Sequence, residues 1–407
     1  MFKGPKFLAG LLFLCLLAPQ FSLSAPFKIG LILPLSGAEK WLGQELRDGA
    51  RLAAESSRDR PELKIIDDGG RAARLERELL RLNDDKEIMA IIGGGTFGQT
   101  SSIEQFSHRL DIPVLVCGDP VGTSRSASEI FQLLPTNEQQ FAAIFDYVTK
   151  TVPAPLGRKT VAIMTGSGHG SRIALERAAS SYDVELNIIN SSTGRLSMDQ
   201  FRQVRRSKAK AAIVIGNNED SLRACQEIRR ASIRCPIFGR LRQASSDFRQ
   251  LAAGRVSEFY VTCAAGHETY PPCEPNFAKS FLDRFGRKPS SWAALAYDGV
   301  SLIGKAVAAA NKRRNRVGQN LARLPMHFGV GFVFSPQSGQ LWFPSIARMD
   351  AQQFVTLRPP GKMSLRRRTQ TSNKTIRRPA RRVRDNKDIT QSGKITKWRH
   401  FLVLPGQ

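Results

Sequence analysis

The chain has 407 residues, of which 41% are hydrophobic, 8% aromatic and 24% charged. This length and apolar content exclude a disulfide-dependent mini-protein and a fibrous repeat, and the aromatic content excludes a wholly disordered chain. The formal net charge is +26, and residues 361–407 contribute 12 of these charges because they hold 14 Lys and Arg against 2 Asp and Glu.

The first 25 residues have the pattern of a secretory signal peptide. Lys3 and Lys6 precede an apolar run at residues 7–18, and small residues follow up to Ser24 and Ala25. This run is short for a membrane-spanning helix, which needs roughly 20 residues. The pattern therefore predicts a cleaved signal peptide over residues 1–25 and a periplasmic or otherwise secreted protein.

From residue 27 onward, short β-branched runs alternate with amphipathic stretches, as in parallel strands joined by crossover helices. Predicted strands cover residues 27–33, 63–66, 89–92 and 114–116, and predicted helices cover 44–57, 72–82 and 100–110. The first 140 residues are therefore interpreted as one doubly wound unit.

A second series of the same kind begins after Pro153 and Pro155. It has predicted strands at residues 160–164, 184–189, 211–215, 236–238 and 256–262, and predicted helices at 171–181, 198–206 and 220–231. The later elements make no complete third unit. They are two predicted helices at 275–285 and 292–310 and strand-like segments at 329–334 and 341–349. We expect these later elements to complete the first two units.

Residues 361–407 form a basic tail with arginine clusters at 366–368, 377–378 and 381–382. Few apolar residues precede Trp398, so the tail cannot bury enough surface to offset its ordering entropy. It is interpreted as a mostly disordered extension.

Several segments carry a family resemblance through their order along the chain. They are KIGLILPLSG at residues 28–37, RDGARLA at 47–53, IIG at 91–93, DIPV at 111–114, FQLLP at 131–135, FLDRFGRKP at 281–289, ALAYDG at 294–299 and GFVF at 331–334. The chain resembles the branched-chain amino acid-type, type I periplasmic binding proteins of ABC importers. No single motif is specific to that family, but their order is.

The resemblance implies an α/β fold of two doubly wound parallel-sheet lobes, joined by a three-segment hinge and without a cofactor. The N-terminal lobe would comprise residues 26–138 and 264–334, the C-terminal lobe 139–263 and 335–360, and the basic disordered tail 361–407. A ligand would lie between the lobes, outside the carboxyl ends of the strands, where open parallel sheets bind ligands. The hinge would close around it.

The turn GGGTFGQT at residues 93–100 nearly matches a phosphate-binding P-loop. Gln99 stands where the lysine is required, so nucleotide hydrolysis is not expected. Two interpretations stay open: a turn whose backbone N–H groups and Thr96 hydroxyl bind a polar ligand group, and a plain tight turn. Phe97 stands at or beside the position where the resembled amino acid receptors have a hydroxyl.

Matching the other loops to the family suggests further ligand-binding residues. They are Trp41 and Leu42 after the first strand, Gly118 and Asp119 after the fourth, His169 before helix 171–181, Asn217 after strand 211–215, and Arg240 and Arg242 after strand 236–238. For each of them, an ordinary loop or surface residue is the alternative.

The resembled amino acid receptors have an acid after strand 236–238 that pairs with the ligand ammonium. Here Leu241 stands there, flanked by Arg240 and Arg242. An unpaired ammonium in a closed cleft is costly, whereas arginine binds carboxylates through bidentate hydrogen bonds. The sequence therefore favours an anionic ligand over a standard α-amino acid, with simple surface charge as the alternative.

The cysteines permit two disulfides in an exported protein. Cys225 and Cys235 are separated by nine residues, as are Cys263 and Cys273, so each pair is a candidate, and Cys117 would be left free. The histidines are scattered along the chain, and no zinc-type spacing occurs. No metal site is predicted.

These features predict a solute-binding protein that captures a small polar or anionic molecule, amino acid-like or carboxylate, and delivers it to the membrane subunits of an ABC importer. The alternative is a non-transport ligand sensor, or an envelope assembly or regulatory protein, that uses the same fold. No nucleophile with a base and no paired carboxylates stand out, so no enzyme is predicted.

The positive charge of the basic tail suggests a partner of its own. It is a candidate contact for an anionic envelope polymer or a membrane surface, with a merely solvated extension as the alternative. Export argues against a nucleic acid partner.

Overall fold

The computed structural model describes residues 26–95, 97–118, 129–151, 159–165, 169–182, 184–263, 276–325, 327–331, 333–334, 345–350 and 354–358. The predicted signal peptide at residues 1–25 and the predicted basic tail at residues 361–407 lie outside the described residues.

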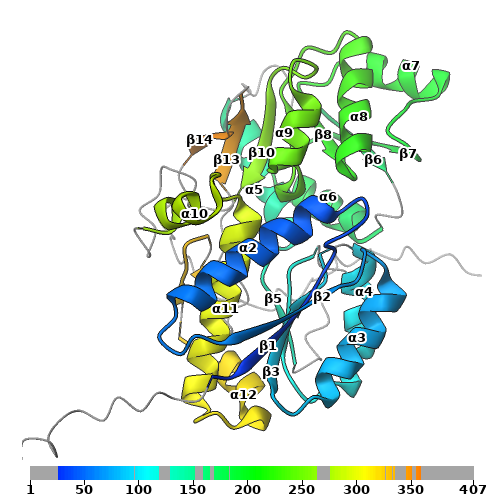
Figure 1. Cartoon of the computed structure of the whole chain (residues 1–407). Coiled ribbons are helices and arrows are strands. Elements are labelled where there is room, and N and C mark those ends of the chain that lie inside the picture. Colours follow the sequence, from blue (N-terminus) through cyan, green and yellow to red (C-terminus); the bar gives the residue numbers. More distant parts are fainter. Residues whose placement is uncertain are drawn as a thin grey trace, which may run out of the picture. The chain divides into compact units, whose positions relative to one another are not determined.

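Five parallel strands form the first sheet, in the order β2-β1-β3-β4-β5 (Figure 1). Their bounds are β1 Lys28–Leu33, β2 Glu62–Asp67, β3 Ile88–Gly93, β4 Val114–Val116 and β5 Ile130–Gln132. Side chains alternate between the faces of a strand, so Leu31 and Leu33 enter one core and Ile32 enters another. The first core is completed by α2 (Lys40–Ser56), α11 (Ser291–Ala309) and α12 (Val317–Arg323), and the second by α3 (Ala72–Asp84) and α4 (Phe97–Phe106).

Seven strands form the second sheet, in the order β14-β13-β10-β9-β8-β6-β7. Their bounds are β6 Thr160–Thr165, β7 Leu186–Ser191, β8 Ala211–Ile215, β9 Ile237–Gly239, β10 Phe259–Cys263, β13 Ser345–Met349 and β14 Phe354–Arg358. The pairings from β7 to β10 are parallel, whereas β13 pairs antiparallel with β10 and with β14. The late strands β13 and β14 therefore join the second sheet.

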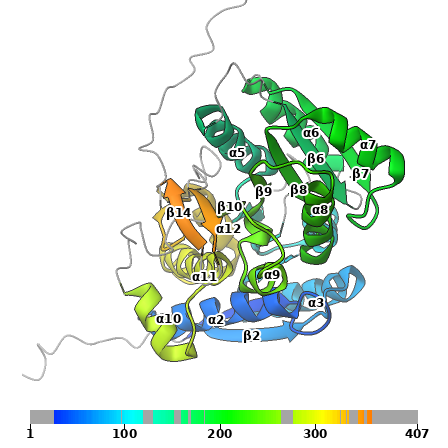
Figure 2. The same ribbon diagram turned by 90° about the horizontal axis from the view of Figure 1, so that it is seen from above.

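Helices cover both faces of the second sheet. Phe141 and Phe145 of α5 (Asn137–Thr151) and Leu175 of α6 (His169–Ser181) enter the core on one face. Val204 and Cys225 enter the core on the other face, from α7 (Met198–Ser207) and α8 (Asn218–Arg230), together with α9 (Ser246–Ala252). Figure 2 shows α5 and α8 on opposite sides of β8 and β9.

The late helices lie against the first sheet. Helix α11 packs along α2, and α10 (Phe277–Phe285) lies beside α2 (Figure 2). Leu52 of α2 shares a hydrophobic cluster with Phe277 and Phe281 of α10. The expectation that these helices complete an earlier unit is confirmed.

The predicted α/β class with two parallel-type sheets is confirmed, but several predicted elements are wrong in detail. Helix α2 begins at Lys40 instead of residue 44, and the single strand predicted at 329–334 is instead a short antiparallel pair, β11 (His327–Phe328) and β12 (Val333–Phe334). Helices α5, α9 and α12 and the strands β5 and β14 were not predicted. Helices α9 and α12 have only seven residues each and β5 only three, which is too short for a periodic signal.

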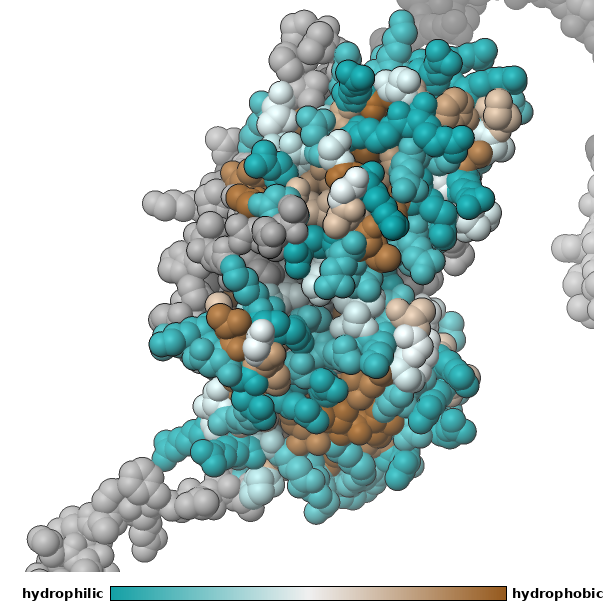
Figure 3. All heavy atoms as spheres, turned by 45° about the horizontal axis from the view of Figure 1, so that its top comes forward, coloured by the Kyte–Doolittle hydropathy of each residue, from teal (hydrophilic) through white to brown (hydrophobic). Residues whose placement is uncertain are grey.

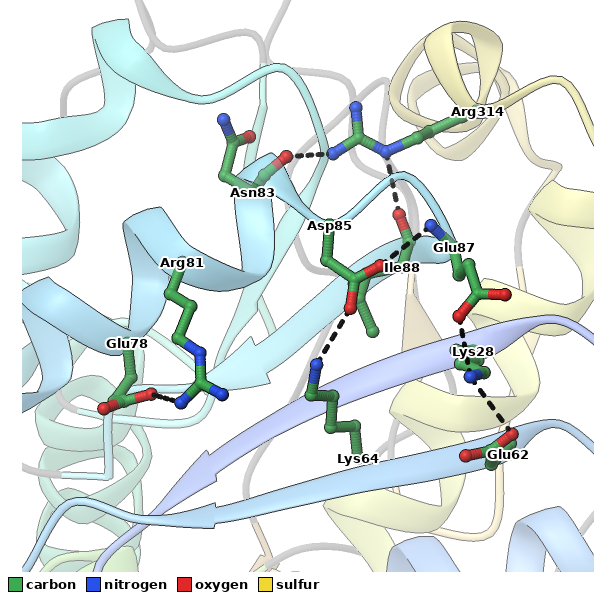
Figure 4. Close-up of polar contacts among 10 residues, drawn as sticks. All are labelled: Lys28, Glu62, Lys64, Glu78, Arg81, Asn83, Asp85, Glu87, Ile88 and Arg314. Carbon is green, nitrogen blue, oxygen red and sulfur yellow. Dashed lines mark hydrogen bonds and ion pairs between the residues drawn. The ribbon is translucent and has the colours of Figure 1, made fainter.

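Ion pairs hold the amino edge of the first sheet (Figure 4). The Lys28 ammonium lies 2.7 Å from Glu87, and that of Lys64 lies 2.8 Å from Asp85 and lowers the pKa of that carboxyl. Arg314 donates hydrogen bonds to the carbonyls of Ile88 (2.9 Å) and Asn83. These charges at the amino edge therefore have structural partners within the protein.

Candidate functional site

Asp67, at the carboxyl end of β2, fixes the loop between β1 and α2. Its Oδ1 accepts hydrogen bonds from the backbone N–H groups of Leu35 (2.9 Å), Ser36 (3.1 Å) and Gly69 (2.9 Å). Burial favours the neutral acid, but the hydrogen bonds from Ser36 and Gly69 outweigh burial and lower the pKa of Asp67. An ionised carboxylate thus anchors the first loop at this edge.

The glycine-rich turn after β3 is built around a residue with positive φ. Gly94 has φ of +73°, and a Cβ there would lie 2.8 Å from Cδ1 of Ile103, so the turn requires glycine. Gln99 is fully buried and donates a hydrogen bond to the carboxylate of Asp68, whose pKa is raised by burial. Gln99 therefore holds the turn to the end of β2, at the position where a P-loop would have its lysine.

Trp41 and Leu42 lie in the first turn of α2 rather than in a loop, because the helix begins at Lys40. Leu42 is fully buried under the glycine turn, since a Cβ on Gly95 would lie 3.0 Å from Cδ2 of Leu42. Trp41 is half-buried, and its ring meets that of Trp292 edge to face, with the ring centroids 6.3 Å apart. Both residues shape this edge by packing, and Trp41 keeps part of its surface accessible.

Loops that follow the two sheets meet at an ion pair. Oε1 of Glu39, the residue before α2, accepts a hydrogen bond from Nη2 of Arg242 in η3 (Leu241–Gln243), 203 residues further along the chain. The two side chains are only 19% and 13% exposed. Oε2 of Glu39 is buried and has no hydrogen-bond partner among the described residues. A buried acceptor without a donor costs free energy, so this oxygen is available to a donor from a bound molecule.

Arg240, the other arginine predicted to contact ligand, lies inside the protein with 4% of its surface exposed. Its Nη1 donates a hydrogen bond to Oδ1 of Asn137, and its guanidinium carbon lies 5.7 Å from the centroid of the Phe141 ring, a cation–π contact. Asn137 and Phe141 belong to α5, the first helix after the chain passes from the first sheet to the second.

Gln140 reinforces the same connection. Its Oε1 accepts hydrogen bonds from the backbone N–H of Leu241 (3.0 Å) and from Oγ1 of Thr262 (3.2 Å), and its Nε2 donates to the carbonyl of Pro135 (3.2 Å). One buried amide thus joins the crossing between the sheets to the ends of β9 and β10. Sequence reasoning missed Gln140 and Glu39, because the partners that reveal their roles are more than 100 residues away.

The sequence profile described as periplasmic binding protein matches residues 26–342 of this chain. The chain belongs to the periplasmic binding protein family. No curated protein matches it.

Solved structures share the fold of this periplasmic binding protein at low sequence identity. LivJ from Streptococcus pneumoniae, a branched-chain amino acid transporter substrate binding protein in complex with isoleucine, is 19% identical with a TM-score of 0.70, over 82% of this chain and 100% of that one. The leucine binding protein LivK from Thermotoga maritima is 15% identical with a TM-score of 0.71, over 81% and 97%. A solute binding protein from R. palustris in complex with benzoate is 16% identical with a TM-score of 0.67, over 82% and 96%.

Asn217 has a local role in this periplasmic binding protein, since it is the N-cap of α8. Its Oδ1 accepts a hydrogen bond from the backbone N–H of Asp220 (2.8 Å), and its Nδ2 donates to Oδ2 of the same residue (3.0 Å). Gly118 likewise has an internal partner, because its carbonyl accepts a hydrogen bond from Nε2 of Gln132 (2.7 Å).

The remaining predicted residues are placed only in part. His169 is the first residue of α6 and Phe97 is the first residue of α4, but the structure does not describe their side chains. Thr96 and Asp119 lie outside the described residues, and their roles stay predictions.

Cys225 and Cys235 are both buried free thiols, so the disulfide considered from their spacing is not formed. A spacing of nine residues sets a loop length but not the geometry between two sulfurs. Cys225 instead packs in the core from α8, and burial raises the pKa of both thiols, that of Cys235 to about 12. The second member of the Cys263–Cys273 pair, Cys273, lies outside the described residues.

Across the part of the chain that the structure describes, no cluster of three or more His, Cys, Asp or Glu side chains is placed to hold a metal ion. None of the described helices is by itself long and apolar enough to cross a membrane; α11 and residues 314–323 meet that test only together, as a pair bent by 110°.

Proposed function

We propose that this protein is an extracytoplasmic solute-binding protein that holds a small polar or anionic solute between the carboxyl edges of its two sheets and delivers it to an ABC importer. Membership of the periplasmic binding protein family supports a binding role. Isoleucine and benzoate, named with two proteins of the same fold, are both small carboxylates. The predicted signal peptide supports a location outside the cytoplasm.

The pair formed by Glu39 and Arg242 carries the proposal. It joins the loop after β1 of the first sheet to the segment after β9 of the second, and the carboxyl ends of parallel strands are where such sheets bind ligands. A guanidinium has five N–H donors, so Arg242 retains donors for a carboxylate after its contact with Glu39. Oε2 of Glu39 has no hydrogen-bond partner among the described residues, so it is available to accept a hydrogen bond from the same solute.

These contacts support different roles for the two predicted arginines. Arg242 faces Glu39 from the other sheet, whereas the Arg240 guanidinium is buried against Asn137 and Phe141. We therefore propose Arg242, Glu39 and the accessible part of Trp41 as ligand contacts, and Arg240 as a residue that holds the hinge.

A thermal-shift screen of the full-length chain against amino acids, amides, and aliphatic and aromatic carboxylates tests the proposal. A ligand at 100 times its Kd adds about 2.7 kcal/mol to the free energy of unfolding, which is a readily visible rise in Tm. The variant Arg242→Gln should weaken binding about tenfold or more, because it removes a charged hydrogen bond worth about 1.5–3 kcal/mol.

Arg284→Gln is the matched control. Arg284 of α10 forms an ion pair with Glu55 of α2, the helix that directly follows Glu39, but both partners of this pair belong to the first lobe. It should keep wild-type ligand binding. If no compound changed the Tm, the result would favour the non-transport alternative over the proposal. If Arg242→Gln bound the ligand with wild-type affinity, the ligand would bind somewhere other than at the Glu39–Arg242 pair.

A further inference from the structure

A polar pocket lies at the free edge of the second sheet and shares no residue with the Glu39–Arg242 site. It has a volume of about 440 Å³, and its lining comes from the edge strand β7 and from α7. The lining residues are Asn187 of β7 and Asp199, Arg202, Gln203, Arg206 and Ser207 of α7. Figure 1 shows both elements together at the upper right.

Two arginines one helical turn apart give the pocket its charge. Arg202 and Arg206 are four residues apart, so their side chains lie on one face of α7, where like charges destabilise a helix by about 0.2–0.5 kcal/mol. Arg202 has a partner in Asp199 at 3.2 Å, but Asp199 is 91% exposed, and such a pair contributes little. The Arg206 guanidinium makes no hydrogen bond or ion pair with any described residue. An anion between the two guanidinium groups would relieve their repulsion.

Hydrogen-bond donors complete the pocket. Gln203 donates through Nε2 to Oδ1 of Asn187 (2.9 Å), which fixes the Asn187 amide and leaves its Nδ2 without a partner among the described residues. The Ser207 hydroxyl is used within the helix, where it donates to the carbonyl of Val204 (2.6 Å). Two guanidinium groups and one amide N–H are a donor set that suits the oxygens of a phosphate group.

The surroundings favour a phosphate on a membrane surface over a free ion. Four further basic residues lie within four residues of the pocket lining along the chain, are exposed and make no ion pair with the described residues: Arg195, Arg205, Lys208 and Lys210. Met198, at the start of the same helix, is 68% exposed. Basic side chains beside a protruding apolar one match the interface of an anionic bilayer, where each Lys or Arg contributes about 1 kcal/mol. On the face shown in Figure 3, hydrophilic side chains predominate over the upper part of the molecule.

We propose that the α7–β7 pocket binds the phosphate of an anionic lipid headgroup and so holds this face of the second lobe against an anionic membrane. Arg202 and Arg206 contact the phosphate, the flanking basic residues contact neighbouring headgroups, and Met198 enters the interface. This surface is separate from the solute site, so it places the protein at a membrane without occupying that site.

Co-sedimentation of the mature chain, residues 26–407, with vesicles tests the proposal, using phosphatidylcholine alone and equal parts of phosphatidylcholine and phosphatidylglycerol. The double variant Arg202→Gln/Arg206→Gln should bind the anionic vesicles about tenfold or more weakly than wild type, since two surface contacts of about 1 kcal/mol each are lost. The matched control is Arg77→Gln/Arg81→Gln on α3, which removes two arginines at the same spacing of four residues. In each helix one of the two arginines pairs with an acid three residues earlier, Arg81 with Glu78 and Arg202 with Asp199.

The control has the same net charge as the test variant and the same basic tail, but its two lost charges lie on α3 and not at the pocket, so it should bind within about twofold of wild type. Circular dichroism checks that both variants fold. If both double variants bound the anionic vesicles equally weakly, the loss would come from net charge alone, and the proposal that the pocket binds a lipid phosphate would be overturned. Binding of inorganic phosphate or glycerol phosphate at the pocket, without a difference between the variants on vesicles, would overturn the lipid assignment.

Discussion

His327 is a buried histidine with a cation beside it. It is 9% exposed, and Nζ of Lys305 lies 2.8 Å from its Nδ1. An ammonium only donates, so Nδ1 accepts and the neutral ring carries its proton on Nε2. Burial, with a further contribution from the Lys305 charge, lowers the pKa of His327 from its ordinary 6.5 to about 4.

This pKa predicts a loss of stability in mild acid. Between pH 6.5 and pH 4 the unfolded chain binds a proton at His327 that the folded protein does not bind, so the free energy of unfolding falls as the pH falls through this window. The loss at pH 5 should be about 2 kcal/mol. Urea unfolding at pH 7 and pH 5 should show His327→Gln with a smaller drop than wild type.

His108→Gln serves as the control, because it removes an exposed histidine. A drop in His327→Gln as large as that in wild type would mean that other groups carry the acid sensitivity.

At the scale of the element, α8 shows that a residue predicted for binding also has a structural role as a helix cap. Asn217 has the extended backbone of an N-cap and accepts the N–H of Asp220. Such caps contribute about 1 kcal/mol to the free energy of unfolding. The signal was present in the sequence, since Asn217 directly precedes a helical segment with acids in its first turn.

Replacing Asn217 therefore separates the two roles. Asn217→Ala should lower the free energy of unfolding by about 1 kcal/mol and leave ligand affinity unchanged, whereas Asn217→Ser, which keeps a capping oxygen, should retain wild-type stability. Denaturant unfolding and a binding titration on both variants measure the two effects. Reduced affinity with unchanged stability in Asn217→Ala would instead assign the residue to the ligand.

At the scale of the whole molecule, the Glu39–Arg242 contact joins loops that follow the two sheets. Reversing its charge with Glu39→Lys should set two cations against each other at low exposure, where repulsion is poorly screened. We expect the lobes to separate, and the radius of gyration from small-angle scattering should rise while each lobe keeps its secondary structure.

Glu55→Lys is the matched control, because Glu55 lies on α2 and pairs with Arg284 of α10 inside the first lobe, at 3.0 Å. It reverses the same kind of pair without touching the contact between the sheets, so its scattering curve should match that of wild type. Identical curves for both variants would show that the Glu39–Arg242 pair does not hold the lobes together.

The sequence by itself determined the local features of this protein. The alternation of apolar residues in segments such as 27–33 identified the strands, the order of motifs identified the family, and the missing lysine at Gln99 excluded a P-loop. Each of these signals lies within one element or one turn, where backbone periodicity and local hydrogen bonding decide the outcome.

Only the tertiary structure decided the order of the strands, the burial of Cys225 and Cys235 as free thiols, and the different partners of Arg240 and Arg242. Arg242 meets Glu39 at a sequence separation of 203 residues, and Arg240 meets Asn137 at 103. Such contacts depend on the packing of both sheets and on the path of the chain between them. No short stretch of sequence contains that information, because burial and partner choice are set by residues from both lobes at once.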